Sequence, residues 1–181
     1  MKNQYFTNSE LEILGVKFGK NCKLHVTTNI LNPKNLILGN DIRIDAFCNF
    51  INKKKIIIKN KVHIGPFCHL GSSDMEIFID SFSGLSSSVK IYTGIEDFSG
   101  RSFFGPHNKI KKKIKNKKLI INKYSVIGAN TIILPNSIIP EGCVVGANCV
   151  VNQKLKKWSV YRNNDLKLIM PRSMSVKKKT K

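Results

Sequence analysis

The sequence has no continuous apolar run long enough to span a membrane, which argues against an integral membrane protein. Its N-terminal stretch, MKNQYFTNSELEIL, also lacks the apolar centre and small-residue cleavage site of a secretory signal. We therefore expect a cytoplasmic protein. A length of 181 residues suits one domain with a substantial core and leaves little room for a second.

Paired cysteines are missing as well. The five cysteines are spread widely, with no CxxC pair among them, so neither a disulfide framework nor a zinc site is indicated. We expect them to be reduced, buried and to pack as small hydrophobic residues, and we expect no metal. They are Cys22, Cys48, Cys68, Cys143 and Cys149.

Acidic residues are scarce: 11 Asp and Glu stand against 31 Lys and Arg, for a formal net charge of +20. Such a charge would suit a polyanion, but the lysines share stretches such as INKKKIIIKNK with abundant asparagine and isoleucine, as a general compositional bias would produce. We expect no nucleic-acid partner. Attraction to phosphorylated small molecules is the weaker inference that remains.

What the chain does contain is a period of six. In VIGANTIILPNSIIPEGCVVGANCVV, a branched aliphatic residue stands at every sixth position from Ile127 to Val151, and the same register extends back to Phe18. The fifth position of each unit is small or slim. It holds Cys22, Thr28, Ile42, Cys48, Val62, Cys68, Ser83, Val89, Ser125, Thr131, Ser137, Cys143 and Cys149.

Neither an α-helix nor a hairpin sheet explains this period. Residues six apart lie about 240° from one another around a helix, and hairpins need period-2 runs between tight turns. A solenoid fits: each unit forms one flat side, three units close a triangular coil, and positions one and five point into the prism. Each coil then buries its apolar residues by stacking on its neighbours.

The pattern, an aliphatic residue followed by Gly, two free positions and a small residue, resembles that of the hexapeptide-repeat acyltransferases, especially the sugar acetyltransferases. The resemblance covers about residues 18–152. It implies an all-β fold, a left-handed parallel β-helix of about six coils, between an N-terminal segment (1–17) and a C-terminal segment with a basic tail (153–181). It also implies a homotrimer with active sites between neighbouring subunits.

Extra residues interrupt the register after the third side of successive coils, so they should project from one edge. The longest insertion is residues 98–120, after the fourth coil, and a loop of this length inside a compact repeat is usually functional. Members of the family use such a loop to cover the acceptor site.

The implied chemistry is transfer of an acyl group, typically acetyl, from coenzyme A to a hydroxyl or amine, for which histidine is the usual base. The histidine that many family members place after a Thr is missing here, where the sequence reads Ile91-Tyr92-Thr93-Gly94. The stretch VHIGPFCHLG resembles a segment of sugar acetyltransferases and offers His69 and His63. In our register His69 lies between Asn49 and Lys90, and both histidines occupy corner positions, about 120° apart around the prism.

IYTGIEDFSG is similar to the segment that opens the long loop in some sugar acetyltransferases. Asp97 could hold the base or bind acceptor hydroxyls. Glu96, Lys90 and His107 are the other candidates on the acceptor side. An amine acceptor would itself be a competent nucleophile, so positioning alone could supply much of the rate.

For the donor, the family lays the pantetheine arm of coenzyme A along the late coils, and KKWSVYRNNDLKLI is similar to the family's C-terminal motif. Trp158 and Tyr161 would then cover the adenine, and Lys167 with Arg162 would face the 3′-phosphate. The matching donor positions in the coils are Gly128, Ala129, Thr131, Gly146 and Ala147.

We therefore expect an acetyl-CoA-dependent acyltransferase whose acceptor is a sugar, most plausibly a nucleotide-linked sugar or a building block of a surface polysaccharide. Alternatives are O-acetylation of an amino acid or antibiotic, and a non-enzymatic β-helix assembly subunit. A carbonic anhydrase would need three zinc-binding histidines converging from neighbouring subunits. His63 and His69 share one coil, and no histidine matches them one coil away.

Overall fold

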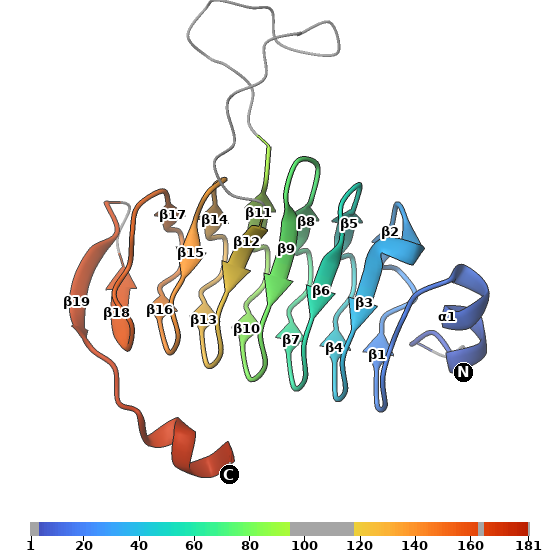
Figure 1. The fold of residues 1–181 in the computed structure, drawn as a ribbon, viewed down its shortest axis with the longest axis horizontal. Helices are drawn as coiled ribbons and strands as arrows, with labels where there is room; N and C mark the ends of the chain where they lie inside the picture. Colours follow the sequence, from blue (N-terminus) through green and yellow to red (C-terminus); the bar gives the residue numbers. More distant parts are fainter. Residues whose placement is uncertain (1–3, 95–117, 163–164, 181) are drawn as a thin grey trace, which may run out of the picture.

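The computed structural model describes residues 4–94, 118–162 and 165–180 of the chain. It is a triangular tube whose walls are three sheets of short parallel strands, stacked from the N-terminal to the C-terminal end (Figure 1). The predicted fold class, an all-β, left-handed parallel β-helix of about six coils, is confirmed.

From β1 to β17 successive strands occupy successive walls, so every third strand returns to the same sheet. The eight-stranded sheet comprises β1 (Lys23–Leu24), β4 (Arg43–Ile44), β7 (His63–Ile64), β10 (Gly84–Leu85), β13 (Val126–Ile127), β16 (Val144–Val145), β18 (Ser159–Arg162) and β19 (Lys167–Pro171). The six-stranded sheet comprises β2 (Asn29–Ile30), β5 (Asn49–Ile51), β8 (His69–Gly71), β11 (Lys90–Tyr92), β14 (Ile132–Ile133) and β17 (Val150–Val151). The five-stranded sheet comprises β3 (Leu36–Leu38), β6 (Ile56–Ile58), β9 (Glu76–Ile79), β12 (Lys118–Ile121) and β15 (Ile138–Ile139).

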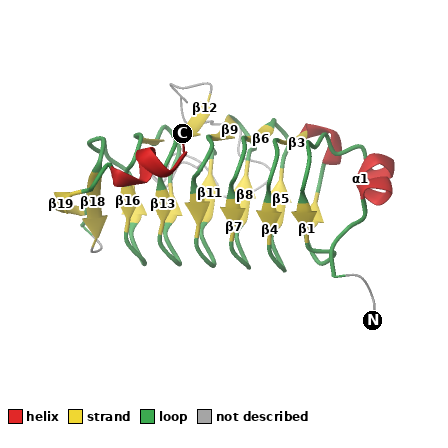
Figure 2. Ribbon diagram, turned by 90° about the horizontal axis from the view of Figure 1, so that it is seen from below, coloured by secondary structure: helices red, strands yellow, loops and turns green. Residues whose placement is uncertain are grey.

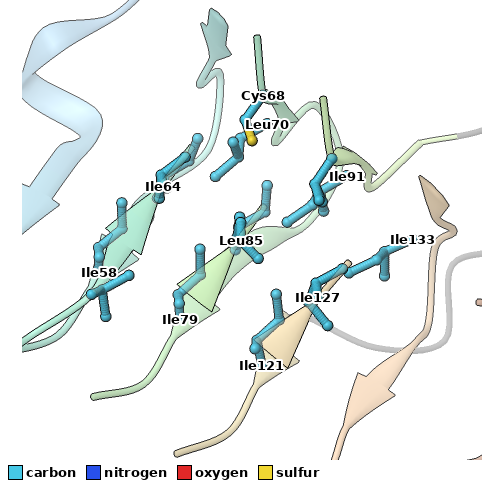
Figure 3. Close-up of a cluster of buried hydrophobic side chains, with 14 of the residues drawn as sticks. Ile58, Ile64, Cys68, Leu70, Ile79, Leu85, Ile91, Ile121, Ile127 and Ile133 are labelled. Carbon is cyan, nitrogen blue, oxygen red and sulfur yellow. The ribbon is translucent and has the colours of Figure 1, made fainter. Parts of the chain in front are cut away.

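The aliphatic residues at position one form the interior, as the period of six predicts. Ile127, Ile133 and Ile139 have no exposed surface, and each lies on a different wall of the same tube. Figure 3 shows such side chains from successive coils pointing toward one another inside the prism. The small residues at position five also turn inward: Cys48, Cys68, Cys143 and Cys149 are buried free thiols.

The walls meet at tight corners, several of which have a residue in the left-handed backbone region. Asn130 and Asn148 adopt φ of 58° and 56°, a conformation that asparagine tolerates well. Phe47 and Phe67 adopt it at the equivalent corners of two earlier coils, and their rings stack with centroids 5.2 Å apart. Stacking of neighbouring coils therefore holds even bulky residues in this conformation.

Both ends of the tube carry additional structure. Helix α1 (Asn8–Leu14) begins with a capping box between Thr7 and Glu10 and buries Leu11 completely. At the other end β18 extends the eight-stranded sheet, and β19 pairs antiparallel with β18. The short 3₁₀ helices are η1 (Pro33–Asn35) and η2 (Ser175–Thr180). Figure 2 shows η2 returning alongside the coils that precede β18.

The connections from β2 to β3, β5 to β6 and β8 to β9, which run from the six-stranded to the five-stranded sheet, project along one edge of the tube, as predicted (Figure 1). The longest insertion falls between β11 and β12, after the fourth coil. Strand β12 begins at Lys118, so the last three residues of the predicted insertion belong to the sheet, where Lys118 pairs with Glu76.

Candidate active site

His63 lies at the edge of a cavity of about 350 Å³ on the outer face of the eight-stranded sheet. Its neighbours across the sheet are Arg43 on β4 and Gly84 on β10, as the sequence register predicts. Because Gly84 has no side chain, the space beside the imidazole stays open. The cavity is lined by His63, Gly65, Pro66, Gly84, Leu85, Ser86, Ser87 and Val126.

Asp45 connects the two basic residues below this cavity. One carboxylate oxygen accepts a hydrogen bond from His63 Nε2 at 2.7 Å, and the other accepts from Arg43 Nε at 2.7 Å. Burial acts to raise the pKa of Asp45, but the hydrogen bonds from His63 and Arg43 outweigh it and hold this pKa below its usual value. Since a carboxylate only accepts, the proton of a neutral His63 lies on Nε2. Nδ1 is then the lone pair available to take a proton.

His69 lies on the adjacent wall, in β8 of the six-stranded sheet. Its neighbours are Asn49 on β5 and Lys90 on β11, which confirms the predicted stacking. Asn49 Nδ2 is 3.3 Å from His69 Nδ1, and the ring of Tyr92 lies against the imidazole with centroids 5.2 Å apart. Burial lowers the pKa of His69, and the charge of Lys90 lowers it further, so both effects favour the neutral imidazole.

The two histidines belong to strands on flat walls, and the prediction that they occupy corners is wrong. The turns instead follow position one, as at Gly65 to Phe67. Within one chain His63 and His69 therefore face different directions, which agrees with the predicted separation around the prism. The other acceptor-side candidates, Asp97, Glu96 and His107, lie outside the described residues.

The Gly-Ala pairs of the late coils occupy one corner of the tube. A Cβ on Gly128 would lie 2.4 Å from the backbone nitrogen of Ala147, and a Cβ on Gly146 would lie 3.0 Å from Cβ of Arg162. Close stacking of the coils thus accounts for both glycines. Ala129 and Ala147 lie beside them on the outside of the corner, where a ligand could approach the backbone.

Thr131 is completely buried on the inside of the same corner. Its hydroxyl donates to the carbonyl of Gly146 at 2.8 Å, which ties one coil to the next. We therefore assign Thr131 a structural role, because it exposes no atom to a ligand in the single chain.

The C-terminal candidates divide into a buried and an exposed pair. Trp158 packs its ring against Gly142 and Tyr124, and Lys177 Nζ lies 5.0 Å from its centroid. Tyr161 is also buried, and its hydroxyl accepts from the backbone nitrogen of Lys156. Both aromatic residues thus belong to the end of the core in the single chain.

Arg162 and Lys167 lie opposite each other in the β18–β19 ladder and are exposed. Lys167 also forms an ion pair of 3.3 Å with Asp165, in which both side chains are more than half exposed. The sequence motif therefore brings two cations together at the surface, an arrangement suited to a phosphate group.

Asp45, Ser86 and Ser87 are not among the site residues predicted from the sequence. Ser86 and Ser87 follow position one of the unit that pairs with His63, so the register alone could have placed them beside it. Asp45 lies one coil before His63, two residues after Arg43, which is the register partner of His63. Only the conformation of the Asp45 side chain brings its carboxylate to His63.

Within the described part of the chain, neither a membrane-spanning helix nor a group of metal-binding side chains is present. No helix within residues 4–94, 118–162 and 165–180 is both long and apolar enough to cross a membrane. The same residues contain no group of three or more His, Cys, Asp or Glu side chains that could hold a metal ion.

Comparisons with family models and with solved structures point to the same protein family. Residues 124–153 match the model described as bacterial transferase hexapeptide (six repeats). No curated protein matches the chain significantly. Among solved structures, a hexapeptide-repeat containing acetyltransferase, VCA0836 from Vibrio cholerae, is similar in fold, with a TM-score of 0.58 and 18% identity over 91% of this chain and 78% of that one.

The AntD structures are much more similar. One is a variant of this N-acyltransferase from Bacillus cereus in complex with dTDP-4-amino-4,6-dideoxyglucose and coenzyme A. It is 31% identical, with a TM-score of 0.90, over 99% of this chain and 96% of that one. Another, AntD with dTDP and 3-hydroxybutyryl-CoA, is 32% identical, with a TM-score of 0.89, over 98% and 95%. This chain therefore belongs to the hexapeptide-repeat acyltransferases.

Proposed function

We propose that the protein transfers an acyl group from coenzyme A to an amino group of a nucleotide-linked sugar. The observation that carries this proposal is the similarity to AntD over nearly the whole of both chains, since AntD structures contain both a dTDP-linked amino sugar and coenzyme A. The sequence left oxygen and nitrogen acceptors open, and this similarity favours nitrogen. The proposal also includes a role in the synthesis of a surface polysaccharide and a location in the cytoplasm.

His63 is the proposed base. The acceptor amine attacks the thioester carbonyl carbon, the carbon–sulfur bond breaks, and the amine loses a proton. His63 Nδ1 takes that proton and passes it to the departing thiolate, so the imidazole is regenerated. Asp45 holds the ring in the required tautomer and stabilises the cation that forms. Two cavity residues, Ser86 and Ser87, can donate hydrogen bonds to the acceptor.

The late coils are the proposed donor side. The backbone beside Ala129 and Ala147 would contact the pantetheine arm, and Arg162 with Lys167 would bind a phosphate of coenzyme A. The cavity at His63 and this surface lie on the same run of coils, β7 to β18.

A homotrimer, in which neighbouring chains complete each site, is part of the proposal. Apolar side chains on the outer face of the five-stranded sheet support a subunit contact: Ile37, Ile57, Phe78, Ile120 and Ile138 are aligned in register, and Ile138 is 46% exposed. The molar mass measured by light scattering tests it.

A thiol-release assay tests the activity. The protein is supplied with acetyl-CoA or 3-hydroxybutyryl-CoA and a panel of acceptors: dTDP-linked sugars bearing free amines, dTDP-linked sugars bearing only hydroxyls, and hydroxyl-bearing amino acids. We expect thiol release with an amino sugar, and comparison of the two donors identifies the preferred acyl chain. Release with hydroxyl sugars or amino acids alone would favour the O-acetylation alternative. No release with any acceptor would favour an assembly subunit.

Histidine variants then assign the base. We expect His63→Asn to lose turnover while it still binds coenzyme A. His25→Asn is the matched control, because His25 lies in the first coil, where its imidazole bonds to Thr27 and contacts the ring of Tyr5. Full activity in His63→Asn would reject His63 as the base.

A further inference from the structure

A ladder of side-chain amides leads to His69 along the outer face of the six-stranded sheet. Asn29 Nδ2 donates to Asn49 Oδ1 at 2.8 Å, and Asn49 Nδ2 then points at His69 Nδ1 at 3.3 Å. The three residues occupy the same register position on β2, β5 and β8. Each side chain in the ladder thus sets the direction of the next hydrogen bond.

The ladder fixes where the proton of His69 lies. An amide NH₂ group only donates, so Nδ1 must accept and the proton of the neutral ring is on Nε2. Nε2 has no hydrogen-bond partner among residues 4–94, 118–162 and 165–180. It lies beside Gly71, where a Cβ would be 3.2 Å from it, so the glycine leaves this N–H uncovered.

Lys90 adds a positive charge next to this donor. It is the register neighbour of His69 on β11, and its Nζ lies 3.4 Å from the carbonyl oxygen of Ser88. The charged group that acts on His69 is this ammonium, and no carboxylate in the described residues does so. The pair therefore offers N–H groups and positive charge to a ligand.

We propose that His69 and Lys90 form a binding site for an anionic oxygen of a phosphate or diphosphate group. In this site His69 acts as a neutral hydrogen-bond donor, not as a base, and Asn49 is the residue that positions it. The inference rests on the proposed function only in naming the source of the phosphate, which is either the nucleotide sugar or coenzyme A.

The first test is the tautomer of His69, measured from the imidazole nitrogen shifts of ¹⁵N-labelled protein at mildly alkaline pH. We expect the proton on Nε2 in the natural protein. In Asn49→Asp a carboxylate replaces the amide donor, so the proton should move to Nδ1. A proton on Nδ1 in the natural protein, or a tautomer that Asn49→Asp leaves unchanged, overturns the proposal.

The second test is titration with inorganic pyrophosphate, followed through the same imidazole shifts. We expect saturable binding that Lys90→Ala weakens about fivefold, the size of one charge-assisted contact at a partly exposed site. Gly71→Ala should weaken it to a similar extent by covering Nε2, with the tautomer unchanged. Lys23→Ala, on the eight-stranded sheet, is the matched control and should stay within about twofold of the natural protein.

Equal affinity for pyrophosphate in the natural protein and in all these variants would overturn the proposed binding site. Competition then identifies the source: displacement of pyrophosphate by dTDP points to the nucleotide sugar, and displacement by coenzyme A points to the donor. Failure of the proposed function has a different signature, because the protein would then release no thiol with the amino sugars, whether or not pyrophosphate binds.

Discussion

Replacement of Asp45 by Asn tests the coupling between this carboxylate and His63. Asn keeps the size of the side chain but removes the charge, and its amide can turn its NH₂ toward His63 Nε2, which would favour the unproductive tautomer. The two hydrogen bonds of Asp45, each 2.7 Å long, would be weakened together. We therefore expect reduced turnover in a folded protein.

The magnitude follows from the exposure of the groups. A hydrogen bond to a charged group contributes about 1.5–3 kcal/mol. The side chains of His63 and Arg43 are 54% and 58% exposed, so solvent screening places the effect at the lower end. A loss of about 1.5 kcal/mol corresponds to about a tenfold decrease in kcat/KM.

The assay is thiol release with the amino-sugar acceptor at saturating acyl-CoA. Arg43→Ala is the control: it removes the other partner of Asp45 and leaves the contact with His63, so activity should fall less than in Asp45→Asn. If Asp45→Asn kept full activity while His63→Asn was inactive, Asp45 would not position the base. If both kept full activity, the cavity would not be the site of proton transfer.

Three further predictions concern stability. Ile139→Ala should lower the free energy of unfolding by about 2–5 kcal/mol in denaturant titrations, because Ile139 is completely buried, whereas Ile13→Ala in helix α1, at 85% exposure, should cost much less; equal losses would contradict the assigned interior. Gly142→Ala should lower the melting temperature and change Trp158 fluorescence, since φ is 68° and the added Cβ would meet the indole ring; an unchanged spectrum would refute this packing. The pKa of Asp45 is below its usual value in the fold, so its ion pairs stabilise the protein above the unfolded-state pKa and that stabilisation is lost as pH falls through the folded-state pKa. The difference in unfolding free energy between the natural protein and Asp45→Asn should therefore shrink on acidification, and a difference that persists in acid would argue against an ionic contribution.

The sequence predicts the interior and the cross-strand neighbours well, because both depend on one repeating register. The position of His69 between Asn49 and Lys90 required only counting in sixes. The contact between Asp45 and His63 could not be found in this way, since the two residues are not register partners and side-chain conformation decides it.

Two other features, helix α1 and the orientation of Thr131, could be predicted from the sequence only by considering more than the spacing of apolar residues. Helix α1 lies outside the repeat, and its sign is the spacing of Thr7 and Glu10 at the start of a short amphipathic stretch. Thr131 looked available to a ligand because it follows a Gly-Ala corner, yet its place at position five sends the hydroxyl inward.

The closed ends of the tube have a consequence for solubility. A stack of parallel strands presents a fresh row of N–H and C=O groups at each end, to which another molecule could add indefinitely. At the N-terminal end, Leu11 of helix α1 is buried against the first coil. At the C-terminal end, β19 is antiparallel to β18, so its exposed edge does not match the parallel strands at the start of another tube. Removal of both helix α1 and β19 should therefore open the two ends and allow discrete particles to add end to end into filaments.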